Sequence, residues 1–245
     1  DEEEMRDPFS GSQPEQPPDL TPTPAQRAAL DDLIAALDEG RPNPFLLQGI
    51  TGSGKTLVYI ELLREALARG RSAIVLVPEI SLTPQTAGRI LGRFPGHRVA
   101  ILHSGLTAAQ RHQQWALAAD GTADIVIGAR SAVFAPVPDG RLGLVIVDEE
   151  HDGSYKQDQA PRYHGRDVAV RRAQLADCPV VLGSATPSLE SWHNATRRGT
   201  YHLHRLQERV TGMQMPRVYI VDFAEERRKR TDRRVHLIGP TLELA

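Results

Sequence analysis

One run of eight residues constrains the chain most, because it needs a strand, a tight turn and a helix in that order. The run has the form Gly-x-x-x-x-Gly-Lys-Thr and consists of Gly49, Ile50, Thr51, Gly52, Ser53, Gly54, Lys55 and Thr56. Its glycines let successive backbone N–H groups point at phosphate oxygens, an approach that side chains would block. Lys55 is spaced to reach the β- and γ-phosphates, and Thr56 to offer its hydroxyl to Mg²⁺. The run therefore predicts a nucleoside triphosphate site.

The residues on either side of this run support that interpretation. The apolar segment Phe45–Leu47 precedes it, and Leu57–Ala68 carries apolar residues at helical spacing after it. A helix that begins here turns its positive N-terminal end toward the phosphates. The alternative is a glycine-rich turn that contains a lysine by chance, and the strand and helix around the run disfavour it.

Short β-branched runs alternate with helical stretches along the rest of the chain. Most of the runs are apolar throughout, as expected for strands that are covered on both faces. The predicted strands are Phe45–Leu47, Ala73–Val77, Val99–Leu102, Ile125–Ile127, Leu144–Val147 and Val180–Leu182. Helix starts are predicted at Thr83-Pro84 and at the capping box of Thr107 and Gln110. The alternation predicts an α/β fold, with a doubly wound, mostly parallel sheet and helices on both faces.

The two ends of the chain differ from this pattern. Residues 1–19 are acidic and rich in proline, so we expect a disordered linker, and a chain that opens on a linker is expected to be a piece of a larger protein. We expect one folded domain over residues 20–222, closing with a possible strand at Arg217–Val221. Residues 223–245 form a charged segment, for which a solvated exit is favoured over a DNA contact.

The composition limits the classes of partner. No stretch approaches the roughly 20 apolar residues that span a bilayer, and the acidic N-terminus is unlike a signal peptide, so we expect a cytoplasmic protein with no membrane partner. The formal charge of −2 argues against indiscriminate polyanion binding, although a local basic surface would still hold nucleic acid. Cys178, the single cysteine, is interpreted as a buried structural thiol. The nine histidines lack cysteine partners at ligand spacing, so no zinc site is expected.

A second motif, Asp148-Glu149-Glu150-His151, follows the predicted strand Leu144–Val147. Ligands of a doubly wound sheet bind beyond the carboxyl ends of its strands, so these carboxylates are expected beside the phosphate loop. Asp148 is the candidate to hold Mg²⁺, which prefers oxygen ligands, and Glu149 is the candidate to orient and deprotonate an attacking water. An acidic surface turn is the alternative, and the intact phosphate loop disfavours it.

A third motif follows the predicted strand Val180–Leu182 and supplies the hydroxyls of Ser184 and Thr186. Two interpretations remain open from the residues alone. These hydroxyls bond to His151 or to the region of Glu149, or the segment is an ordinary connection from a strand to a helix that begins at Ser188.

The three motifs together resemble motifs I, II and III of superfamily 2 helicases. Longer segments are similar to the PriA replication-restart helicase family, and the resemblance runs from Leu20 to the C-terminus. These segments are Val77–Gln85, Leu102–Leu106, Ile127–Pro136, Asp148–Gln157 and Arg162–His164. The resemblance implies a RecA-like first motor lobe and places His151 with Lys55, Asp148 and Glu149 in the catalytic set.

The resemblance also implies further site residues. Gln26 is placed like the glutamine that reads the adenine edge, which favours ATP. Arg130 and Ser131 match residues that contact the DNA backbone, and Asp152–Asp167 resembles the aromatic-rich loop that couples DNA contact to hydrolysis. The candidate contacts in that loop are Tyr155, Lys156, Arg162, Tyr163 and Arg166, with Ser184 and Thr186 added from the third motif. Pro161 stands where some family members carry tryptophan, which weakens the stacking platform, and a polar surface loop is the alternative.

The function implied is that of the ATP-binding lobe of a 3′-to-5′ DNA helicase that uses Mg²⁺ and acts in replication restart and primosome assembly. The implied partners are single-stranded and forked DNA, replication-restart proteins, the replicative helicase with its loader, and single-stranded DNA-binding protein. The family's second lobe, with its arginine finger and zinc module, has no counterpart in this sequence. We therefore expect poor hydrolysis and no strand separation by this chain, because an arginine finger contributes about 10³- to 10⁵-fold.

Three other functions are considered. A DNA-binding or primosome scaffold with a vestigial nucleotide site is disfavoured by the intact Lys55, Asp148 and Glu149. A related superfamily 2 translocase, such as a restriction-enzyme motor subunit, is disfavoured by the loop of residues 155–166. A small-molecule kinase gives the second and third motifs no evident role.

Overall fold

The computed structural model describes residues 21–78, 92–209, 221, 222 and 224. The chain divides by contact into the units Asp1–Thr211 and Gly212–Ala245, and every element below belongs to the first. The predicted linker, the helix start at Thr83-Pro84 and nearly all of the charged segment and of the possible last strand lie outside the described residues. The domain boundaries predicted from sequence stay predictions.

Seven strands form one sheet in the order β3-β4-β2-β5-β8-β1-β9, and every pairing in it is parallel. The strands are β1 (Pro44–Gly49), β2 (Ser72–Leu76), β3 (Val99–Leu102), β4 (Ile125–Gly128), β5 (Leu142–Val147), β8 (Val180–Ser184) and β9 (His202–Leu206). A separate antiparallel hairpin joins β6 (Lys156–Gln157) to β7 (Tyr163–His164). Six strands of the sheet match the predicted ones, whereas β9 was missed because its sequence alternates histidine, leucine and arginine.

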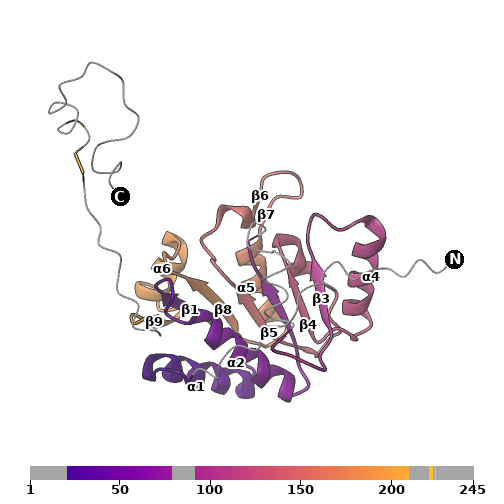
Figure 1. Cartoon of the computed structure of the whole chain (residues 1–245), viewed down its shortest axis with the longest axis horizontal. Coiled ribbons are helices and arrows are strands. Elements are labelled where there is room, and N and C mark those ends of the chain that lie inside the picture. The colour runs from indigo at the N-terminus through magenta and orange to yellow at the C-terminus, as the bar shows by residue number, and fades with distance from the viewer. Residues whose placement is uncertain (1–20, 79–91, 210–220, 223, 225–245) are drawn as a thin grey trace, which may run out of the picture. The chain divides into compact units, whose positions relative to one another are not determined.

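Helices cover both faces of this sheet. They are α1 (Pro24–Glu39), α2 (Lys55–Ala68), α4 (Ala108–Ala119), α5 (Gly165–Leu175) and α6 (Leu189–Thr196), with the short 3₁₀ helices η2 (Arg130–Phe134) and η3 (Gly153–Tyr155). Successive strand residues point to opposite faces. Leu47 packs in the cluster that contains residues of α1 and α2, while Leu46 packs in the cluster that contains residues of α4 and α5. The predicted α/β fold is thereby confirmed (Figure 1).

Local signals in the sequence set several of the boundaries. The predicted capping box is present at α4, where the Gln110 N–H donates to the Thr107 hydroxyl oxygen over 3.2 Å. Ser188 caps α6 by accepting a hydrogen bond from the Ser191 N–H. Cys178 is buried, as predicted, and burial raises the pKa of its thiol to about 12. Within the described ranges, none of the helices has the length and apolar character needed to cross a bilayer.

The central strands bring the three sequence motifs to one edge of the sheet. The strands β5, β8 and β1 are consecutive neighbours and parallel, so the segments that follow them emerge side by side. Gly183 near the end of β8 lets Tyr59 of α2 pass close to the sheet, because a Cβ at residue 183 would overlap the Tyr59 hydroxyl. This close approach positions α2, and with it the phosphate loop, against the sheet.

We expect Gly183→Ala to destabilise the protein by about 1–3 kcal/mol, because the added methyl group forces the tyrosine or the strand to move. Urea unfolding of the variant and the wild type measures the change. Gly153→Ala is the matched control: its Cβ would meet nothing within 4 Å, and its effect should stay within about 0.5 kcal/mol. Equal unfolding midpoints for the two variants would contradict the proposed packing role of Gly183.

Candidate functional site

The phosphate loop between β1 and α2 adopts the conformation for which its glycines were predicted. Gly52 and Gly54 both have φ of +81°, a backbone region that other residues avoid. Gly49 faces Ser53 so closely that a Cβ at residue 49 would overlap the serine Oγ. The Ser53 Oγ is buried and has no hydrogen-bond partner within the described part of the chain. A cradle without room for side chains and with an unsatisfied buried hydroxyl suits a phosphate group.

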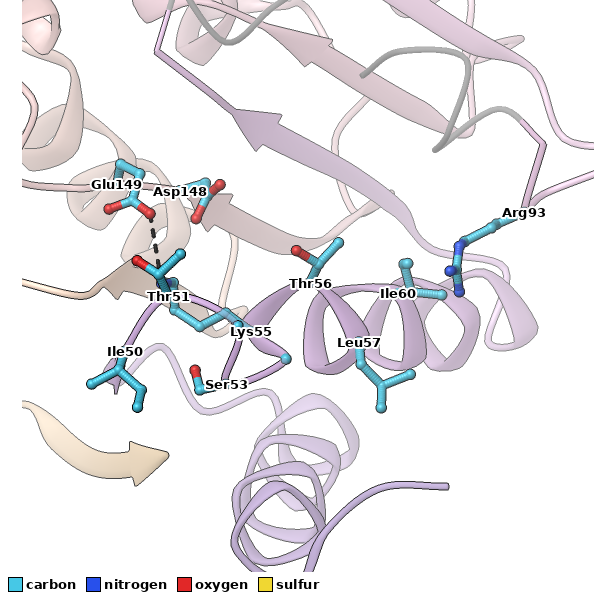
Figure 2. A pocket seen from close by; sticks show the side chains of 12 residues that line it. Ile50, Thr51, Ser53, Lys55, Thr56, Leu57, Ile60, Arg93, Asp148 and Glu149 are labelled. Atoms are coloured by element: carbon cyan, nitrogen blue, oxygen red, sulfur yellow. Dashed lines mark ion pairs between the residues drawn. The ribbon is translucent and has the colours of Figure 1, made fainter. Parts of the chain in front are cut away.

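The loop opens into a pocket of about 410 Å³ (Figure 2). The residues that line it are Ile50, Thr51, Gly52, Ser53, Gly54, Lys55, Thr56, Leu57, Ile60, Arg93, Asp148 and Glu149. Most of the predicted nucleotide-binding residues are therefore brought together, and the predicted carboxylates lie with them. Sequence reasoning missed Arg93, because a single arginine in a turn carries no motif. Gln26 is not part of the lining.

Lys55 lies close to two oxygens. Its Nζ donates to the Gly49 carbonyl oxygen over 2.9 Å and lies 3.5 Å from the Glu149 Oε1 (Figure 2). Its side chain is only 10% exposed, so this charge is partly removed from water and depends on nearby oxygens. A phosphate group offers stronger partners than one carbonyl and one carboxylate at 3.5 Å.

Asp148 follows β5 and is held from two sides. The Tyr59 hydroxyl donates to its Oδ1 over 3.0 Å, and its own backbone N–H donates to the Leu76 carbonyl over 2.9 Å. Desolvation and, after it, the charge of Glu149 raise the pKa of the Asp148 carboxyl. A carboxylate that is desolvated beside another carboxylate is stabilised by a cation, and Thr56 supplies a hydroxyl in the same pocket. These residues fit a divalent cation such as Mg²⁺.

Glu149 turns its carboxylate into the pocket through an uncommon backbone conformation. Its φ is +45°, a left-handed value that non-glycine residues rarely adopt and that is often found at functional sites. One carboxylate oxygen faces Lys55, and the other lies 3.6 Å from His151 Nδ1. The residue is therefore placed between the group expected to bind phosphate and the histidine of the second motif.

The hydroxyls of the third motif contact His151. Ser184 Oγ lies 2.8 Å from His151 Nδ1, and Thr186 Oγ1 lies 3.4 Å from Nε2. Ser188 is the N-cap of α6. Both interpretations that the sequence left open therefore hold in part: the hydroxyls contact His151, and the segment also leads into a helix that begins at Ser188. The second and third motifs are thus in direct contact.

Glu150 was given no role from sequence, yet it is the most completely bonded carboxylate of the site. It is 0% exposed and accepts hydrogen bonds from the Ser188 N–H and hydroxyl, the Ser191 hydroxyl and Arg166 Nη1, at 2.7–3.2 Å. It therefore ties the end of β5 to the starts of α5 and α6. The sequence signal was a second glutamate in the motif, which does not say which of the two is buried.

Three residues predicted as contacts have their side chains inside the protein. Arg166 is buried and paired with Glu150 and Asp167. Tyr155 is 0% exposed and its hydroxyl donates to the Asp148 carbonyl over 2.7 Å. Gln26 is fully buried; its Nε2 donates to the Ser53 carbonyl and its Oε1 accepts from the Thr23 N–H. Their contacts with DNA and nucleotide stay predictions.

The other predicted DNA contacts lie at or near the surface. Lys156, Arg162 and Ser131 are exposed, and Tyr163 is half-buried. Arg130 is turned toward the loop, where its Nη1 donates to the Ser154 and Lys156 carbonyls. The structure therefore separates the loop into an exposed hairpin and an internal anchor, Tyr155, which reaches Asp148.

Comparison with known proteins agrees with this arrangement. The DEAD/DEAH box helicase family matches residues 23–195. A relative from Bacillus subtilis (strain 168) called replication restart protein PriA is 48% identical over 227 residues, which cover 93% of this chain and 28% of the relative. The Synechocystis protein of the same name is 48% identical over 215 residues, covering 86% of this chain and 25% of the relative. The chain thus spans about a quarter of the length of these relatives.

Solved structures show the same fold. The structure of RecG bound to a three-way DNA junction matches with a TM-score of 0.57 and 25% identity, over 85% of this chain and 25% of that chain. The DUF1998 helicase MrfA bound to DNA matches with a TM-score of 0.51 and 16% identity, over 81% of this chain and 31% of that chain. The resemblance to PriA stated from the sequence is confirmed by the curated relatives.

We expect Asp148→Asn to stabilise the nucleotide-free protein at neutral pH. Because the pKa of this carboxyl is raised above 3.8, the folded state holds the proton more tightly than the unfolded chain. The wild type therefore loses stability as pH rises from the unfolded pKa through the folded pKa, while asparagine still accepts from Tyr59 and does not titrate. Thermal unfolding in chelator between about pH 4 and pH 8 should show a gain that grows and then levels off.

Asp152→Asn is the matched control for this experiment. A hydrogen bond from Ser154 lowers the pKa of the Asp152 carboxyl. Its contribution to stability is therefore present above the unfolded pKa and is lost as pH falls through the folded pKa. This variant should be less stable than the wild type at neutral pH. A change in stability of the same sign in both variants would contradict the raised pKa of the Asp148 carboxyl.

Proposed function

The chain belongs to the DEAD/DEAH box helicase family, and from this premise we propose that it is the ATP-binding lobe of a DNA helicase that acts in replication restart. One observation carries the proposal. Lys55, Asp148 and Glu149, which come from two segments far apart in sequence, line one pocket of about 410 Å³ at the end of a parallel sheet. These are the residue types that phosphate binding, metal binding and water activation require.

In the proposed mechanism, phosphate binding exchanges the partners of Lys55. Nucleotide phosphates replace the Gly49 carbonyl and Glu149 as its partners, while the N–H groups of the loop and the start of α2 add further donors. Thr56 and Asp148 would hold Mg²⁺, which would neutralise charge on the phosphates. The exchange releases Glu149 from its ion pair.

Glu149 then acts as the group that orients and deprotonates the attacking water. His151 faces the second oxygen of this carboxylate and is itself held by the Ser184 hydroxyl, at 2.8 Å from Nδ1. Movement of β8 or of the segment after it therefore changes the position of His151 and, through His151, the surroundings of the Glu149 carboxylate. This gives the third motif a mechanical role that does not require it to touch the nucleotide.

We assign the coupling of DNA contact to ATP hydrolysis to the loop that follows the second motif. Its exposed hairpin meets DNA through Lys156, Arg162 and Tyr163, and its buried end reaches the metal-binding residue through the bond between Tyr155 and the Asp148 carbonyl. Arg130 joins the two parts by binding the carbonyls of Ser154 and Lys156. A shift of the hairpin on DNA is thereby transmitted to Asp148.

We propose that the Gln26 side chain binds the phosphate loop first and contacts nucleotide only afterwards. Its amide bridges Thr23 at the start of α1 and the Ser53 carbonyl in the phosphate loop. An adenine contact requires at least one of these bonds to be exchanged. ATP rather than another nucleoside triphosphate is proposed on the resemblance of this position alone.

The wider role follows from the relatives, whose names identify replication restart proteins. We propose 3′-to-5′ movement on single-stranded and forked DNA, and contacts with replication-restart proteins, the replicative helicase with its loader and single-stranded DNA-binding protein. Efficient hydrolysis is proposed to need an arginine from a second lobe. Because the chain spans about a quarter of its relatives, turnover should be measured with and without forked DNA, both for this chain and for a version extended to their length.

DNA-stimulated turnover by the extended version, with ATP binding but slow turnover by this chain, is the expected result. ATP binding with no turnover by either protein would favour the scaffold function. Forked DNA that binds without changing the turnover of the extended version would remove the coupling from the proposal.

Lys55→Ala is expected to weaken ATP binding by about 10- to 150-fold, because hydrogen bonds to a charged group contribute about 1.5–3 kcal/mol. Calorimetric titration with Mg-ATP measures the affinity, and circular dichroism checks that the fold is retained. Lys156→Ala removes an exposed lysine of the hairpin and should leave ATP affinity unchanged. An unchanged affinity of Lys55→Ala for Mg-ATP would contradict the assignment of this pocket as the nucleotide site.

Tyr155→Phe is expected to lower the ratio of ATP turnover with DNA to turnover without it, because the bond to the Asp148 carbonyl is lost while the buried ring remains. The extended version is the protein to use, since its turnover is measurable in both conditions. Tyr201→Phe, on the segment before β9, is the matched loss of a hydroxyl. A proportional fall in both turnover rates would mean that Tyr155 supports the fold and carries no coupling.

A further inference from the structure

Phe134 at the end of η2 is exposed in a way that the site described above does not use. Its side chain is 47% exposed, the highest value for a phenylalanine, tyrosine or tryptophan in the ranges that the structure describes. The flanking residues Val133 and Ala135 are both fully buried. Within residues 132–135, exposure is therefore confined to one aromatic ring.

The backbone on both sides of this ring is held from inside the protein. Arg172 of α5 donates hydrogen bonds from Nη1 to the Val133 carbonyl and from Nη2 to the Ala135 carbonyl. Burial lowers the pKa of this guanidinium, and the two carbonyl bonds offset the cost of removing its charge from water. The half-buried Arg172 thus holds the backbone of the turn on both sides of the exposed Phe134.

A second aromatic ring from a distant segment lies beside Phe134. The ring centroids of Phe134 and Tyr163 are 5.0 Å apart, with an interplanar angle of 77°, which is an edge-to-face contact. The Arg130 guanidinium carbon is 5.9 Å from the centroid of the Tyr163 ring. Tyr163 belongs to the β6–β7 hairpin, which projects beyond the end of the sheet (Figure 1). Phe134 and Tyr163 together are named the aromatic edge.

Basic side chains lie on the same hairpin. Lys156 and Arg162 are exposed, and the acidic residue between them, Asp158, pairs with Lys156 over 3.0 Å. Both members of that pair are well exposed, with side chains 67% and 77% accessible. An exposed pair of this kind contributes little and is readily exchanged for a phosphate. The Arg162 Nε–H donates a hydrogen bond to the Asp158 carbonyl, and this bond holds the guanidinium on the hairpin.

We propose that the aromatic edge is a stacking site for an unpaired base of single-stranded DNA, with Lys156 and Arg162 meeting the adjacent phosphates. The proposal deepens the proposed function and rests on it. A rigid exposed ring beside basic groups is the combination that binds single strands without reading sequence, because every base has a π-face. It moves the stacking role from Tyr155, which is buried, to Phe134, which no motif singled out.

The test compares the affinity of the chain for two oligonucleotides in about 50 mM salt, where phosphate contacts are strong. One is a thymidine oligomer with a single 2-aminopurine, whose fluorescence is quenched by stacking, and the other has abasic sites throughout. Phe134→Ala should weaken binding of the first by about 5- to 150-fold and leave binding of the second unchanged. Leu175→Ala, which removes a 70% exposed side chain from the end of α5 that leads toward the start of β8, should change neither.

Phe134→Leu is a second test variant, which keeps the inference testable if the alanine variant does not fold. Leucine keeps an apolar side chain at this position but has no π-face, so it should lose the quenching and most of the base-dependent affinity. A surface that docks another protein through apolar contact would retain its function with leucine, and quenching retained by this variant would overturn the stacking proposal.

The remaining outcomes separate this inference from the proposed function. Equal losses for base-bearing and abasic DNA would show that Phe134 supports the hairpin and does not stack, which overturns the inference alone. Unchanged affinity in both Phe134 variants would overturn it alone as well. If the wild-type chain binds neither oligonucleotide, the DNA contact in the proposed function fails together with the inference.

Discussion

The site depends on the parallel pairing of three neighbouring strands, β5, β8 and β1. In a parallel sheet every strand ends at the same edge, so the phosphate loop, the acidic motif and the Ser184–Thr186 segment are brought together although more than a hundred residues separate the first from the last. The space between β8 and α2 is small enough that only glycine fits at residue 183 opposite Tyr59. The same packing carries the tyrosine hydroxyl to Asp148. Fold and chemistry therefore share one set of contacts.

The charged groups of the site are paired with one another to different degrees. Glu150 is fully buried and fully bonded, which suits a structural role because a buried carboxylate is stable only with several donors. Glu149 and Lys55 are 3.5 Å apart, beyond the usual hydrogen-bond distance, so their pairing is weak. Asp148 is desolvated beside a second carboxylate, so the pKa of its carboxyl is raised. The proposed chemistry uses the weakly paired groups, and the strongly paired one holds the frame.

Three of the contacts predicted from the family resemblance share one feature. Tyr155, Arg166 and Gln26 belong to residue types that are polar at the tip, and the resemblance places these tips at ligands. Each of them instead finds an internal partner, respectively the Asp148 carbonyl, Glu150 and the Ser53 carbonyl. Phe134 is the opposite case, an apolar residue left at the surface. Residue type predicts the chemistry of a side chain and does not say which neighbour reaches it.

The sequence by itself determined the elements and the chemistry of the pocket: six of the strands of the sheet, the capped start of α4, the phosphate loop and the identity of the carboxylates. These follow from local rules, because strand periodicity, capping and glycine conformation involve residues that are close along the chain. Only the tertiary structure decided that β9 completes the sheet, that Glu150 is the buried glutamate, that Tyr155 points inward and that Arg172 exposes Phe134. These outcomes depend on contacts between residues far apart in sequence, where burial and hydrogen-bond partners are set by packing.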